Sequence, residues 1–275
     1  MINAVGNRMT REIARQSKLS DQLERIQTQI SGGKKLLRAS DDPAASQRIA
    51  TIGKAQASAK TWAANVKTAT AQVSQADSAL GSVSNLLTRA RELTMTAASA
   101  TTNPADRASI AAELSAIADE IDGFAATREA NGEPIFATNA KQWRFDADVS
   151  FAPVPSASTA FVVDGNSVST GLRDAAAAIT AGDSAAMGAA LETLSGAISH
   201  IADQRAAMGL SAGRLERIGD SLDLRGITLS DERSAVEDTD LSVAIAELNA
   251  QKLTLDAAQA AFARINRQTL FDILS

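Results

Sequence analysis

The sequence is poor in reactive and metal-binding residues. Its 275 residues include no cysteine, no tyrosine and one histidine, His200. Without cysteine the chain forms neither a disulfide nor a thiolate metal site, and one histidine without cysteine argues against a histidine-based triad or a zinc site. We therefore expect no enzymatic activity, no cofactor and no metal, and we interpret His200 as part of a helix surface or packing contact.

Aromatic residues and long apolar runs are scarce as well. Aromatics make up 3% of the chain, whereas hydrophobic residues make up 45%, with alanine supplying much of that share. Alanine-rich surfaces suit closely packed helices better than a thick globular core. No stretch approaches the ~18 consecutive apolar residues of a membrane span, and the N-terminus lacks the apolar region of a cleavable signal. We expect no membrane insertion, and export only by a route without such a signal.

The charges exclude further functions. The net charge is −5 and the pI is about 5.1, which argues against a nucleic-acid partner. The run Gly32–Lys35 lacks the spacing of a phosphate-binding P-loop. Because the helix macrodipole favours negative charge at a helix start, we interpret one set of acidic residues as helix-start residues and not as metal ligands: Asp41, Asp42, Glu237, Asp238 and Asp240.

The most prominent feature of the sequence is two sets of apolar residues that recur every seven positions, which we call ladders. A strict seven-residue repeat keeps one seam of a helix against a partner helix. The ladders therefore predict two long helices, about residues 43–100 and 184–235, that pair within one chain. The ladder residues are Ile52, Ala59, Val66, Val73, Leu80 and Leu87 in the first, and Leu194, Ile201, Met208, Leu215, Leu222, Leu229 and Val236 in the second.

Local signals mark where the other helices begin and end. Gly32 and Gly33 end a helix that covers residues 2–31, because glycine is favoured just past a C-terminus. Asp42 before Pro43, and Asn103 before Pro104, are helix starts. The apolar spacing after Pro104 predicts an antiparallel return helix over residues 104–127.

Composition shifts at mid-chain. Residues 132–171 hold three of the five prolines and four of the seven phenylalanines. The patterns Phe145–Phe151 and Phe161–Val163 predict short strands among loops. Helix is expected to resume near Leu172, with a break at 182–184.

Four glycines lie inside the second ladder: Gly209, Gly213, Gly219 and Gly226. Each costs about 1 kcal/mol relative to alanine in an isolated helix. Their clustering indicates close approach of another backbone or a local break near Gly209.

We therefore predict a mainly α fold, with a long antiparallel helical bundle or coiled coil formed by both chain ends and a small β-rich segment at mid-chain. The expected domains are residues 1–42 with 237–275, the terminal helices that form an inner assembly domain; 43–131 with 172–236, an inner helical rod; and 132–171, a small exposed segment.

The two terminal helices are the candidate functional part. Their apolar stripes are too thin to hold a lone helix in water. Either they fold back onto the inner bundle, or they are disordered alone and fold on assembly against neighbouring copies. We favour assembly, and expect these residues to carry it: Ile13, Leu23, Ile26, Ile30, Leu248, Leu255, Phe262 and Ile265.

Several motifs in this order resemble those of the bacterial flagellin family. The resemblance covers about residues 1–137 and 190–275. It is carried by the connection from Ser31-Gly32-Gly33-Lys34 to Asp41-Asp42-Pro43-Ala44, by Asp106-Arg107 through Asn131-Gly132, by Arg205–Gly209 with Gly213–Glu216, and by Glu237-Asp238-Thr239-Asp240-Leu241.

The resemblance implies a structural subunit of the bacterial flagellar filament that self-assembles into a helical homopolymer and serves motility. It also implies an extracellular location, export through the flagellar type III apparatus, an export chaperone that covers the C-terminal helix, and contacts with hook-associated and cap proteins.

Two alternatives stay open. The end of the chain, Thr269–Leu274, is more similar to the hook–filament junction subunit, hook-associated protein 3, whereas a middle segment of only about forty residues favours a filament subunit. An alternative of another class is a cell-surface adhesin or carbohydrate-binding homologue that uses residues 138–171, with Trp143, Asp146 and Asp148 as its candidate groups.

Overall fold

The structure is a computed structural model that describes the backbone of residues 2–99 and 102–274, and the side-chain surroundings of 9–99 and 102–264. The mainly α fold predicted from the sequence is confirmed. The elements described are α1 (Ile2–Gly32), α2 (Pro43–Ala97), α3 (Pro104–Ala125), β1 (Trp143–Arg144), β2 (Ser150–Phe151), α4 (Ala157–Phe161), β3 (Val162–Val163), β4 (Asn166–Ser167), α5 (Val168–Ala181), α6 (Ser184–Glu237) and α7 (Leu241–Leu274).

Contacts divide the chain into two compact units. Unit 1 comprises residues 1–57 and 227–275, and unit 2 comprises residues 58–226. Both ends of the chain therefore belong to one unit, and the long helices α2 and α6 contribute residues to both. Among the described residues, no helix combines the length and the apolar character that a bilayer crossing requires.

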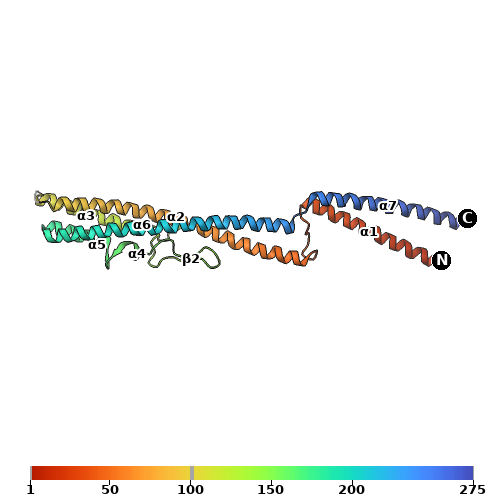
Figure 1. The fold of residues 1–275 in the computed structure, drawn as a ribbon, viewed down its shortest axis with the longest axis horizontal. Helices are drawn as coiled ribbons and strands as arrows, with labels where there is room; N and C mark the ends of the chain where they lie inside the picture. The colour runs from red at the N-terminus through yellow and green to blue at the C-terminus, as the bar shows by residue number, and fades with distance from the viewer. Residues whose placement is uncertain (1, 100–101, 275) are drawn as a thin grey trace. The chain divides into compact units, whose positions relative to one another are not determined.

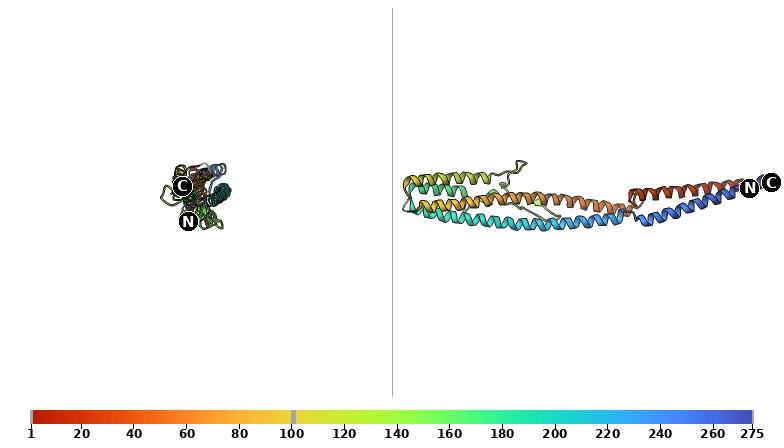
Figure 2. Two further views of the ribbon diagram at one scale, coloured as in Figure 1. Left: turned by 90° about the vertical axis from the view of Figure 1, so that its left-hand side faces the viewer. Right: turned by 90° about the horizontal axis from the view of Figure 1, so that it is seen from above.

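Unit 2 is built around α2, α3, α5 and α6, which lie side by side (Figures 1 and 2). Both predicted ladders lie in its core, so their pairing within one chain is confirmed. The buried ladder residues of this unit are Ala59, Val66, Val73, Leu80 and Leu87 on α2, and Leu194, Ile201, Met208, Leu215 and Leu222 on α6.

The helix boundaries follow the predicted capping residues. The side-chain oxygen of Asn103 accepts a hydrogen bond from the Asp106 N–H at 2.9 Å, with Pro104 as the first residue of α3. Gly182 ends α5 in the left-handed conformation, at φ 69°, which glycine adopts without steric cost. The return helix and the break at 182–184 are thus confirmed, whereas α5 begins four residues before Leu172.

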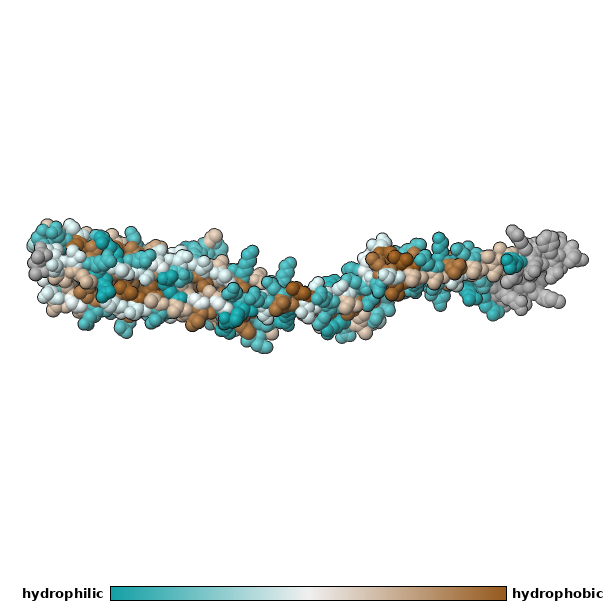
Figure 3. Space-filling view, turned by 45° about the horizontal axis from the view of Figure 1, so that its top comes forward, coloured by the Kyte–Doolittle hydropathy of each residue, from teal (hydrophilic) through white to brown (hydrophobic). Residues whose placement is uncertain are grey.

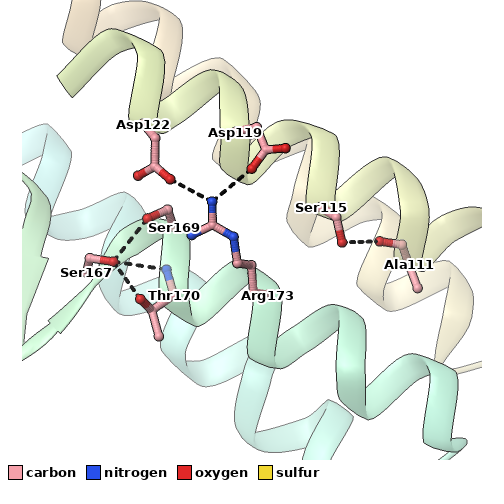
Figure 4. Close-up of polar contacts among 8 residues, drawn as sticks. All are labelled: Ala111, Ser115, Asp119, Asp122, Ser167, Ser169, Thr170 and Arg173. Carbon is pink, nitrogen blue, oxygen red and sulfur yellow. Dashed lines mark hydrogen bonds and ion pairs between the residues drawn. The ribbon is translucent and has the colours of Figure 1, made fainter. Parts of the chain in front are cut away.

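An ion-pair cluster joins α5 to α3 in unit 2 (Figure 4). The Arg173 guanidinium contacts a carboxylate oxygen of Asp119 at 2.8 Å and one of Asp122 at 2.6 Å. Burial raises the pKa of Asp122, but hydrogen bonds from Ser169 and Arg173 lower it by more, so the net pKa is below its ordinary value. Because the cluster is largely exposed, it adds little to the stability of the fold. We interpret it as a contact that aligns α5 with α3.

The mid-chain segment, residues 132–171, packs onto the helices and is less exposed than the sequence led us to expect. Two-residue strands form the hairpins β1–β2 and β3–β4, and Phe161 ends α4 instead of beginning a strand. Large aromatic groups gain the most from burial, and the segment supplies several to the core: Phe136, Phe145 and Phe161 are buried, together with Ile135 and Val154.

Contacts from α6 also hold this segment. The Arg225 guanidinium pairs with the Asp146 carboxylate at 3.2 Å, the Arg214 guanidinium lies 4.1 Å from the centre of the Phe151 ring, and His200 Nε2 lies 2.9 Å from the Thr159 carbonyl oxygen. His200 is therefore a packing residue, as expected. Of the groups considered for an adhesin, Asp146 is in an ion pair and Trp143 is half-buried.

The glycines of α6 do not interrupt it, since the helix is continuous from Ser184 to Glu237. A methyl group added at Gly219 would lie 3.6 Å from Val66 on α2, which explains this glycine by close helix packing. Gly209 has no neighbour within 4 Å of such a methyl group, and at Gly213 the neighbour is Arg217 of the same helix. The close approach inferred from the sequence is therefore found at Gly219.

Candidate assembly interface

The candidate site is the pair of helices α1 and α7, which pack together in unit 1 (Figure 1). The less exposed residues of each helix recur at alternating spacings of four and three, so they form one stripe per helix. The stripes are Glu12, Gln16, Leu19, Leu23, Ile26 and Ile30 on α1, and Ala244, Leu248, Gln251, Leu255, Ala258 and Phe262 on α7.

Most of the residues predicted to carry assembly lie on these stripes. Leu23, Ile26, Ile30, Leu248, Leu255 and Phe262 are buried or half-buried along the seam between α1 and α7. Ile13 lies off the seam and is 54% exposed. Ile265 lies outside the residues whose side chains the structure describes.

The seam is a weak contact because polar side chains interrupt it. Gln16 and Gln251 occupy stripe positions, and of the stripe residues only Ile26 and Ala244 are buried. The amide nitrogen of Gln16 is buried and makes no hydrogen bond within the described structure. An unsatisfied buried polar group costs about 1–3 kcal/mol, so the pair has little stability to spare.

A second apolar stripe lies on the opposite side of α7, about half a helical turn from the seam. All its members are exposed, including Leu253 at 72% and Val243 at 61%, and apolar residues are visible on the surface of this helix pair (Figure 3). We call this set the outer stripe: Val243, Ala246, Ala250, Leu253, Ala257 and Ala260.

The corresponding face of α1 is polar. It carries Ser17, Lys18, Asp21, Arg25 and Thr28, with Ala14 as an apolar residue among them, and all six are exposed. Over the residues whose side chains the structure describes, α1 therefore has one apolar face, which is used in the seam, whereas α7 has two and uses one. The sequence reasoning missed the outer stripe because it weighed large side chains, and four of the six positions are alanine. The six positions are separated alternately by three and four residues, and this spacing is the sequence signal that identifies the outer stripe.

The connections that lead into the two helices are tied together. The Lys35 N–H donates to the Glu237 carbonyl oxygen at 2.9 Å, and the Thr239 N–H donates to the Gly33 carbonyl oxygen at 2.9 Å. These bonds form an antiparallel bridge between Lys34 and Asp238. The end of α1 and the start of α7 are therefore held at one point of unit 1.

A charged cluster reinforces this junction. The Glu237 carboxylate pairs with Lys34 Nζ and, at 2.7 Å, with Arg233 Nε. Hydrogen bonds from Arg233 and Lys34 hold the pKa of Glu237 below its ordinary value, against a smaller opposing effect of burial. The interpretation of Glu237 as a helix-start residue is wrong, because it ends α6. Asp240 caps α7 instead, and its carboxylate accepts from the Ser242 N–H at 2.9 Å.

Unit 2 also contains an open groove of about 530 Å³ between the β3–β4 hairpin, α5 and α6. Alanines and glycines line it, and its carboxylates are Asp164, Asp174 and Glu192. Across the described residues, no three histidine, aspartate or glutamate side chains converge in a way that suits a metal ion.

Comparison with known proteins identifies the helical parts. Residues 3–141 match the profile of the bacterial flagellin N-terminal helical region, and residues 191–274 match that of the bacterial flagellin C-terminal helical region. No curated protein sequence matches the chain significantly.

Solved structures with a similar fold include three flagellar proteins. One, from Vibrio parahaemolyticus and assigned as a flagellar hook-associated protein, is 14% identical with a TM-score of 0.66, covering 72% of this chain and all of its own. FlgL of Xanthomonas campestris is 15% identical with a TM-score of 0.57 and coverages of 66% and 99%. FlgL of Bacillus cereus is 18% identical with a TM-score of 0.54 and coverages of 66% and 98%.

Proposed function

Because the chain belongs to the bacterial flagellin family, and is therefore a structural subunit of the flagellum, we propose that it polymerises into the filament through α1 and α7. In this proposal residues 1–42 and 237–275 form the inner assembly domain, and residues 43–131 and 172–236 form the inner helical rod. Residues 132–171 form the outermost segment.

The outer stripe of α7 is the observation that carries this proposal. A helix that is apolar on two opposite faces needs a partner on each, and α1 covers one of them. Small side chains such as Ala246, Ala250 and Ala257 allow another helix to approach closely. A second copy of the chain covers the outer stripe in the polymer, where the weak seam also gains stability by mass action.

The same stripe accounts for the proposed export partners. Before assembly, an exposed apolar face on α7 is an aggregation hazard, so a chaperone that covers α7 keeps the subunit soluble until the flagellar type III apparatus exports it. Hook-associated and cap proteins then contact the first and last subunits through the same helices.

A filament subunit is favoured over a junction subunit by the short middle segment, part of which is buried against the helices of unit 2. The junction alternative stays open, because two of the similar structures are FlgL, which is hook-associated protein 3. At 18% and 15% identity this likeness shows the fold alone and does not choose between the two subunits. A deletion strain separates the two, since loss of a junction subunit leaves hooks and releases filament monomers into the medium, whereas loss of a filament subunit removes the filament.

The assembly proposal predicts that charges on the outer stripe abolish polymerisation. In Ala250→Glu/Leu253→Glu, both new carboxylates are on exposed positions, so the monomer keeps its helical content, but polymer formation would bury them without partners. Purified chains, seeded or salted out, are followed by sedimentation and electron microscopy. Ser17→Glu, on the polar face of α1, is the matched control and should polymerise. Polymers of wild-type yield from the double variant would overturn the assignment.

A further inference from the structure

We propose that the groove between the β3–β4 hairpin, α5 and α6 binds a linear aliphatic amine that carries several ammonium groups. Polyamines such as spermidine are ligands of this class. The inference concerns unit 2 and a small-molecule ligand, and it does not depend on polymerisation. Its test and the test of the proposed function therefore have separate outcomes.

The groove is open because small residues line it from both helices. On α5 the lining residues Gly171, Asp174 and Ala178 recur at intervals of three and four, so they share one face of that helix. A methyl group added at Gly196 of α6 would meet no atom within 4 Å. The chain therefore leaves this space unfilled by its own side chains. The matching lining stripe of α6 is Ala186, Ala189, Thr193 and Gly196.

The charges around the groove have one sign. Its carboxylates are Asp164 on the hairpin, Asp174 on α5 and Glu192 on α6, and among the described residues no lysine or arginine lines it. All three are exposed, and none is in an ion pair with a residue that the structure describes. The one arginine of α5, Arg173, is occupied by the ion-pair cluster with α3. The groove therefore attracts a cation and repels an anion.

The three carboxylates come from three different elements, and this arrangement does not suit a single compact cation. Divalent cations need several oxygen ligands around one centre, and within the described chain no three acidic or histidine side chains converge in that way. Quaternary ammonium groups are recognised by aromatic cages, and the described lining of the groove contains no aromatic residue. The arrangement fits positive charges that are separated along one ligand.

A linear polyamine has both properties that the groove requires. Its ammonium groups are separated by short methylene chains, so they pair with separate carboxylates. The methylene groups between them pack on an apolar floor, and burial of that surface favours binding. The groove volume of about 530 Å³ also lies within the range of small-molecule sites. The buried residues of the floor are Val168, Ala190, Leu194 and Ala197.

The hairpin holds one of the carboxylates in place before a ligand binds. The pairing of β3 with β4 leaves Asp164 and Gly165 as a two-residue turn. Both residues have positive φ, 50° and 84°, as a type I′ hairpin turn requires. A ligand that pairs with Asp164 and also with Asp174 or Glu192 joins the hairpin to the helices, so its binding stabilises unit 2 by mass action.

Titration of the monomeric chain with spermidine tests this assignment. Isothermal titration calorimetry should show one saturable site per chain, and saturating spermidine should raise the Tm of unit 2 by a few degrees. Asp164→Asn, Asp174→Asn and Glu192→Gln should each weaken binding about twofold to fivefold, as expected for exposed charge pairs.

The matched control is Glu216→Gln, which removes an exposed carboxylate from α6 at a position outside the groove lining. It should bind spermidine like the wild type. The assignment is refuted if the wild type shows no saturable binding up to about 10 mM spermidine, or if Glu216→Gln loses as much affinity as Glu192→Gln.

Ala189→Leu distinguishes a defined site from a diffuse attraction between an acidic protein and a cation. Leucine keeps the charge and is a good helix former, but its side chain occupies the groove. Spermidine should therefore bind about tenfold more weakly, while the Tm without ligand stays unchanged. Butylamine, with one ammonium group, should bind less tightly than spermidine at equal ionic strength.

Wild-type affinity in Ala189→Leu, or equal affinity for butylamine and spermidine, contradicts the inference. A chain that polymerises but does not bind spermidine refutes this inference alone. A chain that binds spermidine but does not polymerise refutes the proposed function alone.

Discussion

Leu210 and Leu215 are five residues apart on α6, and their surroundings are opposite. Leu215 is fully buried in the core of unit 2, whereas Leu210 is 77% exposed. We therefore expect the two leucines to contribute differently to the free energy of unfolding of the monomer, although their side chains are chemically identical. Their difference comes only from the helical period that turns one toward α2 and the other outward.

We predict that Leu215→Ala lowers the free energy of unfolding by about 2–5 kcal/mol, because it removes buried methyl groups and leaves a cavity. Leu210→Ala should change it by less than about 0.5 kcal/mol. Urea unfolding of the monomer, followed by circular dichroism, measures both. Equal losses from the two substitutions would mean that the burial of Leu215 does not stabilise unit 2.

Among the helices, α7 carries the feature that the sequence did not first indicate, its outer stripe. The regular repeats of α2 and α6 were predictable because a seven-residue pattern records burial directly. Asn103, Pro104 and Gly182 were predictable because caps and left-handed positions are local. The outer stripe was not recognised, since alanine contributes little to an apolar count even where it marks a packing face.

The mid-chain hairpins were the least predictable elements. A strand of two residues is too short to show an alternating apolar pattern in the sequence. Its position is determined by contacts with helices that are distant in the sequence. Arg214 lies over Phe151 and Arg225 pairs with Asp146 across about sixty to eighty positions of sequence. Such pairings have no local signal, so residues 132–171 were expected to be more exposed than they are.

The junction of α1, α6 and α7 gives a prediction for pH. Because the folded pKa of Glu237 is depressed, its ionised form favours the folded state, so its stabilisation is present above the ordinary glutamate pKa of about 4.3 and is lost as the pH falls through the lower folded pKa. Glu237→Gln should lower the Tm of unit 1 by a few degrees at pH 7 and have a vanishing effect in strong acid.

Thermal unfolding of wild type and variant across that pH range measures this difference. Glu247→Gln, at an exposed position on α7, is the control and should leave the Tm unchanged throughout. A Glu237→Gln effect that stays constant down to the lowest pH would show that the carboxylate charge is not what stabilises the junction.

The molecule as a whole combines two units of unequal strength. Unit 2 has a continuous core contributed by α2, α3, α5, α6 and the mid-chain segment. The α1–α7 pair of unit 1 has a narrow seam with two glutamines in it. A region of a polymer subunit that completes its contacts only on neighbouring copies is expected to have low stability in the monomer.

This contrast predicts the pattern of amide hydrogen exchange. In the monomer, amides of α1 and α7 should exchange much faster than those of α3 and those around Ile201 of α6, which lie in the unit 2 core, and polymerisation should slow the terminal helices selectively. Mass spectrometry of peptic fragments, before and after polymerisation, measures both states. Uniform protection in the monomer, or no slowing on polymerisation, would contradict the view of a weak pair that assembly completes.

The bridge between Lys34 and Asp238 has a consequence for synthesis. It joins positions about two hundred residues apart, so the junction closes only after the ribosome has translated all of unit 2 and the start of α7. Unit 2 ends at residue 226, so we expect it to fold before the junction closes. We therefore expect a chain that stops early to carry a folded rod without a closed junction or an outer stripe, and we expect the proposed polymer not to incorporate it.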